Sequence, residues 1–162
     1  ALLNRGWRKR DDRQGMMLST ARSFLFNELL SARLADGTWC QPLVGDTIML
    51  DGTQSVFSID AIDAMLQSRA AELDIHPTGV LWGVGEPSEG DAGAYEAQLL
   101  KQYPALCGGL ERSGVKQSRR ALRMRLLDPQ LHWEAGTVVL SFSLPRGSFA
   151  TAVMNELLVV GG

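Results

Sequence analysis

The sequence is poor in the residues that build metal centres and disulfide scaffolds. Its 162 residues include two cysteines, Cys40 and Cys107, and two histidines, His76 and His132. None of the four has a partner residue at the spacing of a metal site, and the cysteines lie 67 positions apart. The sequence therefore predicts no metal site and no disulfide framework, and it favours a reduced, cytoplasmic setting.

Long apolar runs and nucleotide-binding motifs are also missing. Charged residues interrupt every hydrophobic stretch, so none approaches the roughly 18 to 20 residues that cross a bilayer. The segment Gly83–Pro87 lacks the later glycine and the lysine of a phosphate loop, and no Gly-x-Ser-x-Gly elbow supports a serine nucleophile. The first residue is not Met and no signal-peptide core follows it, so we expect the chain to begin inside a larger gene product.

What the sequence does have is segregated charge. Residues 1–33 carry seven basic and three acidic side chains, and residues 101–125 carry seven basic side chains against one acidic. Residues 34–100 carry one basic side chain against eleven acidic ones, so the net charge of -2 hides the pattern. Two basic segments that meet in space would attract a polyanion. The alternative is that each segment is only a solvated face.

Nucleic acid is the leading polyanion, because arginine suits bidentate contacts with phosphate. Aromatic residues make up 7% of the chain and do not alternate with the arginines. This favours recognition of the shape and backbone of a folded RNA over base stacking along a single strand. The candidate RNA-binding residues come from both basic segments: Arg8, Arg10, Arg13, Arg22, Arg119, Arg120 and Arg123.

Apolar spacing predicts an α+β fold of mixed helices and short, mostly antiparallel strands. Helical spacing begins at Met17, with Ser19 or Thr20 as the cap, and stops before Gly37; it returns from Asp60 to Glu72, from Tyr95 to Leu106, and from Ala150 to Val160. Strand patterns occupy residues 47–50, 55–59, 119–126, 130–133 and 137–144. Residues 76–79 are expected to end a helix, residues 79–93 to form a glycine-rich loop, and Gly108-Gly109 to follow the third helix.

Three segments resemble the tRNA pseudouridine synthase D (TruD) family. They are residues 18–27 (LSTARSFLFN), residues 119–123 (RRALR) and above all residues 144–151 (LPRGSFAT). The resemblance implies an RNA-modifying isomerase that converts uridine-13 in the D arm of tRNA to pseudouridine, without a metal or organic cofactor. It also implies that residues 1–123 are most of the family's TRUD insertion domain. Residues 124–162 would be a strand-strand-helix segment of the catalytic domain.

The resemblance also assigns roles to single residues. Phe149 matches the family's substrate-binding phenylalanine, which would wall the pocket around a uridine taken out of its stack. The alternative is an apolar anchor for the last helix. Arg146 and Asn155 depart from the family pattern, in which a small residue and an arginine are usual.

The family's nucleophilic aspartate and its Asn-x-x-x-Phe-Gly motif lie in an N-terminal half that has no counterpart here. We therefore expect this chain alone to be inactive and its partners to be tRNA and that half of the catalytic domain. Asp46 is better explained as a turn residue than as a substitute nucleophile. The charge pattern alone supports a different function equally well, a non-catalytic RNA-binding module. A structural or interaction domain, which would not bind tRNA, is the third hypothesis.

Overall fold

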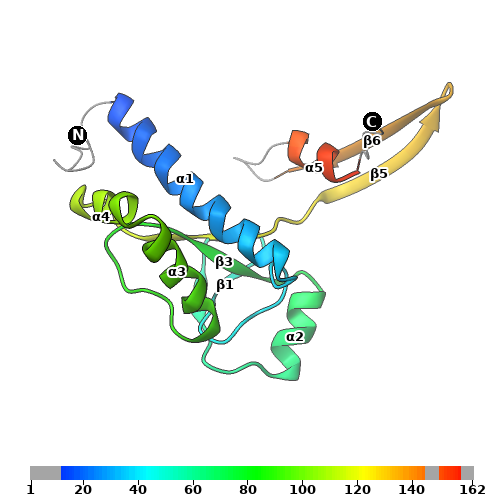
Figure 1. The fold of residues 1–162 in the computed structure, drawn as a ribbon. Coiled ribbons are helices and arrows are strands. Elements are labelled where there is room, and N and C mark those ends of the chain that lie inside the picture. Colours follow the sequence, from blue (N-terminus) through cyan, green and yellow to red (C-terminus); the bar gives the residue numbers. More distant parts are fainter. Residues whose placement is uncertain (1–11, 145–149, 158–162) are drawn as a thin grey trace. The chain divides into compact units, whose positions relative to one another are not determined.

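The computed structural model describes residues 12–144 and 150–157, and its contacts divide the chain into two compact units (Figure 1). Residues 1–123 form unit 1 and residues 124–162 form unit 2. Within the described residues, unit 1 contains α1 (Asp12–Ala35), β1 (Thr47–Leu50), β2 (Val56–Ser58), α2 (Ala64–Ala71), β3 (Ile75–Leu81), α3 (Gly90–Gln102), α4 (Pro104–Arg112) and β4 (Ser118–Ala121). Unit 2 contains β5 (Leu127–Glu134), β6 (Thr137–Ser143) and α5 (Ala150–Leu157). The mixture of helices and antiparallel strands confirms the predicted α+β class.

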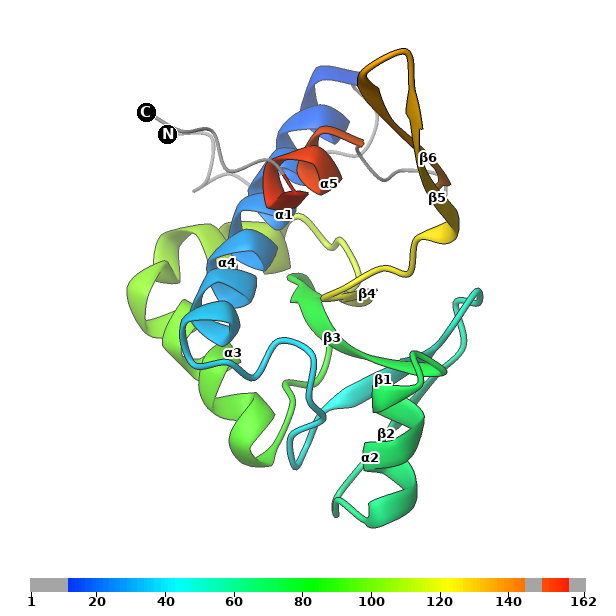
Figure 2. The ribbon, with the colours of Figure 1, turned by 90° about the vertical axis from the view of Figure 1, so that its right-hand side faces the viewer.

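Unit 1 is built on a four-stranded antiparallel sheet in the order β2-β1-β3-β4 (Figure 2). The predicted hairpin at Asp51-Gly52 joins β1 to β2, and Gly52 has the positive φ of 68° that such a turn favours. Strand β3 was not predicted, because Pro77 and Gly79 suggested the end of a helix. The segment is almost fully buried and pairs with a strand on each side, β1 and β4, so it is a strand and the helix-end prediction was wrong.

Helices α1, α3 and α4 pack together, and α1 lies along β3 (Figures 1 and 2). They share one core cluster with β3: Leu18, Ala21, Leu25, Phe26, Leu29, Val80, Trp82, Leu99, Cys107, Leu110 and Leu122. A second cluster joins α2 to the strands through Ile48, Ile59, Ala70 and Ile75. Unit 1 therefore has the buried apolar interior that holds polar side chains in fixed positions.

The helix ends differ from the predictions in three places. Helix α1 begins at Asp12, before the predicted cap, and the Thr20 hydroxyl donates to the carbonyl of Met16 inside the helix. In α2 the cap is Asp63, whose carboxylate accepts from the amide of Leu66 at 2.7 Å, so the helix does not begin at Asp60. Pro104 opens α4, which runs through Gly108-Gly109 instead of ending before them.

Unit 2 contains the second predicted hairpin. Strands β5 and β6 pair from Leu127↔Ser143 to Glu134↔Thr137, and Ala135 and Gly136 both have positive φ at the turn, 47° and 83°. The predicted strand over 119–126 stops at Ala121, and Met124 is exposed. No helix in residues 12–144 and 150–157 is long and apolar enough to span a membrane.

Candidate nucleic-acid interface

The structure places the seven candidate arginines in very different surroundings. Arg8 and Arg10 lie outside the described residues, as does Phe149, and Arg13 lies in the first turn of α1. Arg22 is on α1, and the rest belong to β4 or to the segment that leaves it. The remaining candidates can be separated by the groups that their guanidinium nitrogens contact.

Arg119 is held inside unit 1 by a carboxylate. It forms an ion pair with Glu96 of α3, and the two side chains are 12% and 4% exposed. The carboxylate of Glu96 also accepts from the amide and the hydroxyl of Ser88, each at 2.9 Å. Because its charge is neutralised within the fold, Arg119 fixes α3 and the Ser88 loop against β4.

Arg123 also acts within the fold. Its Nε donates to Nδ1 of His76 at 3.1 Å, and its Nη2 donates to the carbonyls of Ile75 and Ala70. A guanidinium can only donate, so Nδ1 of His76 is the acceptor and Nε2 donates to Asp51, 2.8 Å away. Desolvation lowers the pKa of Arg123 below its ordinary value. These bonds anchor the last residue of unit 1 to β3 and α2.

Arg22 connects the two basic segments. Its Nη2 donates to the carbonyl of Leu81 at 3.0 Å, to the carbonyl of Lys116 at 3.1 Å and to the hydroxyl of Ser118 at 2.8 Å. Burial, followed by the positive charge of Arg120, lowers the pKa of Arg22. Arg22 and Arg120, nearly a hundred positions apart in sequence, are therefore close enough for their charges to interact.

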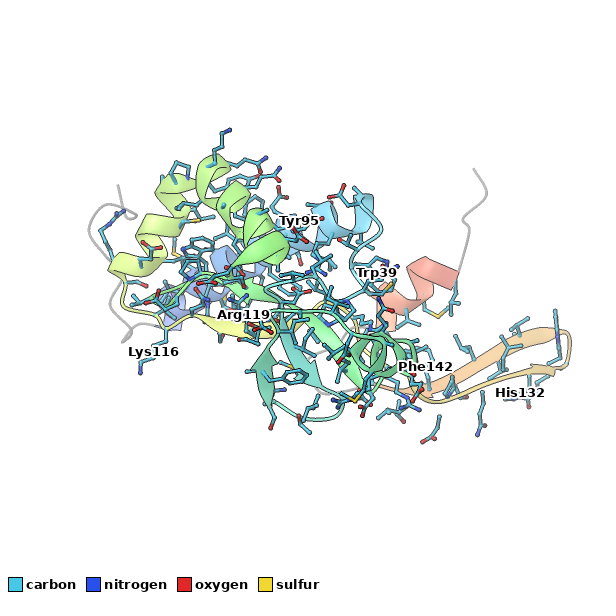
Figure 3. The ribbon with its side chains drawn as sticks, turned by 90° about the horizontal axis from the view of Figure 1, so that it is seen from below. Trp39, Tyr95, Lys116, Arg119, His132 and Phe142 are labelled. Atoms are coloured by element: carbon cyan, nitrogen blue, oxygen red, sulfur yellow. The ribbon has the colours of Figure 1, made fainter. Side chains whose placement is uncertain are left out.

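Arg120 points away from Arg119, because successive side chains of a strand lie on opposite faces. Its guanidinium carbon lies 5.1 Å from the centroid of the Phe26 ring, a cation–π contact with α1. The side chain is exposed, as is that of Lys116, which Figure 3 shows projecting from the edge of unit 1. The solvent-accessible cations of this region are thus Arg120 and Lys116, beside the half-buried Arg22.

The pairing of Arg33 with Asp46, the most buried ion pair among the described residues, was not predicted from the sequence. Arg33 Nη1 lies 2.7 Å from Asp46 Oδ1, and the side chains are 1% and 2% exposed. Asp46 also accepts from the amide of Leu43 at 2.8 Å, so it organises the loop before β1. Burial raises the pKa of Asp46, because desolvation outweighs the opposing effect of Arg33. Helical spacing places Arg33 on the same face of α1 as Arg22, and that spacing indicates neither its burial nor its partner.

The described residues hold no cluster of metal ligands. No three His, Cys, Asp or Glu side chains in this part of the chain lie together as metal ligands would. Asp36 accepts from the Tyr95 hydroxyl, and Asp74 pairs with Arg69, so these aspartates stabilise the fold. His132 lies on the β5–β6 hairpin with its side chain 53% exposed (Figure 3).

Sequence comparison gives a consistent family. The model of the family "tRNA pseudouridine synthase D (TruD)" matches residues 10–157. A tRNA pseudouridine synthase D of Chromohalobacter salexigens is 51% identical over 156 residues, which cover 95% of this chain and 45% of that protein. One from Xanthomonas euvesicatoria pv. vesicatoria is 49% identical over 154 residues, 93% of this chain and 42% of that protein. The chain thus spans less than half the length of these relatives.

Structural comparison agrees on the fold. The crystal structure of the putative tRNA pseudouridine synthase D (TruD) from Methanosarcina mazei superposes with a TM-score of 0.68 at 22% sequence identity. The match covers 83% of this chain and 36% of that one. With a family match over nearly the whole sequence, the chain belongs to the tRNA pseudouridine synthase D family.

Proposed function

We propose that this chain works as part of a tRNA pseudouridine synthase that converts uridine-13 in the D arm to pseudouridine. The family match over residues 10–157, with 51% identity to a relative of that name, carries the proposal. Residues 1–123 would be most of the TRUD insertion domain and would contact tRNA. Residues 124–162 would belong to the catalytic domain. The reaction needs no metal or organic cofactor on this proposal.

The nucleophile of the reaction would come from an aspartate outside this chain. That aspartate attacks the uridine, the detached uracil turns, and it rejoins the ribose through carbon. Five aspartates of residues 12–144 bind groups of their own fold, which fits this division of labour: Asp36, Asp46, Asp51, Asp63 and Asp74. This chain would supply RNA contacts and part of the substrate pocket.

Phe149 would wall the uridine pocket. Replacing it should reduce turnover and leave the affinity for tRNA nearly unchanged, because a pocket wall acts on the flipped base while phosphate contacts supply most of the affinity. The test compares kcat and Kd of Phe149→Ala with those of Phe24→Ala, a phenylalanine that is 42% exposed on α1. A Phe149→Ala variant that folds and keeps full turnover would remove this role.

Site selection is tested with two tRNA transcripts that differ only at position 13, uridine in one and cytidine in the other. The complete gene product that contains residues 1–162 should form pseudouridine in the first transcript and not at that position in the second. Chemical modification followed by primer extension locates the product. Tight tRNA binding without any pseudouridine would favour the alternative, a non-catalytic RNA-binding module. Absence of binding at low salt would exclude both.

A further inference from the structure

The arginines of unit 1 fall into two groups according to whether a carboxylate neutralises them. Three described arginines have an assigned carboxylate partner: Arg33 with Asp46, Arg69 with Asp74, and Arg119 with Glu96. Among residues 12–144 and 150–157, Arg22, Arg120 and Lys116 have no carboxylate within ion-pair distance. Arg22 lies on α1, Arg120 on β4 and Lys116 in the segment that enters β4, and the hydrogen bonds of Arg22 bring these parts together.

The fold holds these cations together by specific contacts. Arg22 donates to the carbonyl of Lys116 and to the hydroxyl of Ser118, which fixes the segment that enters β4 against α1. Ser118 and Arg120 alternate along β4 and so project from the same face, where the charge of Arg120 acts on Arg22. These contacts fix the backbone that carries the exposed side chains of Lys116 and Arg120 beside α1.

A close packing contact supports Arg120. Gly79 pairs with Arg120 in the β3–β4 register, and a Cβ at Gly79 would lie 2.8 Å from a ring carbon of Phe26. The absence of that Cβ lets the Phe26 ring lie against the sheet, beneath the guanidinium of Arg120. Phe26 is 5% exposed, so its ring is not available to stack on a base. The surface therefore offers charge and donors and no aromatic platform.

Adjacent guanidinium groups without a counterion repel each other, and an anion placed between them would relieve that repulsion. Burial increases the benefit of a bound anion, because Arg22 is partly desolvated. Its Nε is also buried without a hydrogen-bond partner among the described residues. Guanidinium forks and an ammonium group match the geometry of phosphate oxygens.

We propose that Arg22, Arg120 and Lys116 form a binding site for a backbone phosphate of folded RNA. The proposal rests on the proposed function, and it narrows that function's RNA contacts to one place. Arg120 and Lys116 contact the phosphate directly, and Arg22 positions both while adding its charge. Arg119 and Arg123, which share the same segment, hold the fold together and do not contact RNA. Binding here is independent of base sequence.

The test uses the complete gene product and measures the Kd for tRNA between 50 and 200 mM salt. Arg120→Gln and Lys116→Gln should each weaken binding and reduce the slope of log Kd against log salt by about 1. Between 50 and 200 mM salt, the Kd of each variant should therefore rise about fourfold less than the Kd of the unmodified protein. The melting temperature should stay within a few degrees of the unmodified protein, because both side chains are exposed.

Two matched controls remove a positive charge elsewhere in unit 1. Arg69→Gln deletes an arginine already paired with Asp74, and Lys101→Gln deletes an exposed lysine of α3. Neither should change the slope. The site is wrong if Arg120→Gln and Lys116→Gln keep the slope and affinity of the unmodified protein, or if the controls lower them equally.

The same experiment separates failure of the site from failure of the proposed function. Unmodified protein that binds tRNA and forms pseudouridine, with both variants unchanged, overturns the site alone. Unmodified protein that binds without forming pseudouridine, with both variants impaired, overturns the proposed function and leaves the site standing. Protein that does not bind tRNA at low salt overturns both.

Discussion

Replacing Asp46 by Asn should destabilise the protein far more than most surface substitutions. The change keeps the size of the side chain and removes the charge that faces Arg33 at 2.7 Å. Both side chains are almost fully buried, so Arg33 would be left as an uncompensated charge in the interior. Removing one partner of a buried ion pair typically costs about 3 to 5 kcal/mol.

The surroundings of Arg33 place the expected cost at the lower end of that range. Its Nη2 also donates to the carbonyls of Thr38 and Gln41, each at 2.8 Å, and these acceptors remain in the variant. We expect a loss of about 3 kcal/mol in the free energy of unfolding, a large fraction of the roughly 5 to 15 kcal/mol of an ordinary domain.

The assay is urea unfolding followed by circular dichroism, with Asp74→Asn as the matched control. Asp74 lies 2.6 Å from Arg69, and those side chains are 54% and 35% exposed. Solvent screens such a pair, so its loss should cost about 1 kcal/mol or less. Equal losses from the two variants, or a loss below about 1 kcal/mol for Asp46→Asn, would refute the reasoning that burial determines the cost.

Two further predictions concern packing and titration. Gly79→Ala should lower the free energy of unfolding by about 1 to 3 kcal/mol in thermal unfolding, because its Cβ would meet the Phe26 ring at 2.8 Å. Gly15→Ala, which has open space around it on α1, should stabilise the protein slightly. Equal effects of the two substitutions would contradict the packing argument. Burial raises the pKa of Cys107 to about 11, so at pH 8 a thiol reagent should label the half-exposed Cys40 and reach Cys107 only after unfolding. Because the pKa of Cys107 is higher in the folded protein, the free energy of unfolding should fall as pH rises from the ordinary pKa of 9.0 to about 11. Cys107→Ala should make this fall less steep. An unchanged fall would contradict the raised pKa of Cys107.

The parts of the fold that follow from local chemistry could be predicted from the sequence. Asp51-Gly52 and Ala135-Gly136 are short turn sequences in which the glycine has positive φ, and both predicted hairpins are present. Strand β3 could not be predicted in this way. Its Pro77 and Gly79 are unfavourable locally, and the segment is a strand because neighbouring strands and the Phe26 ring pack around it.

At the candidate interface, the sequence likewise could not predict which arginines are neutralised by a carboxylate. Arg119 and Arg120 are adjacent and chemically identical, and the period of a strand predicts that they point to opposite faces. Which one meets a carboxylate depends on the packing of α3, which brings Glu96 to Arg119. The sequence therefore identified the basic segment and could not separate its structural arginines from those left without a partner.

The most direct test of this account is the release of tritium from tRNA labelled at C5 of uridine, because rejoining the base through carbon expels that hydrogen. The complete gene product that contains these residues should release tritium with multiple turnovers, and residues 1–162 alone should release none. Release by residues 1–162 alone would contradict the claim that the nucleophile lies outside this chain. No release by the complete gene product, under conditions in which it binds the tRNA, would contradict the proposed activity.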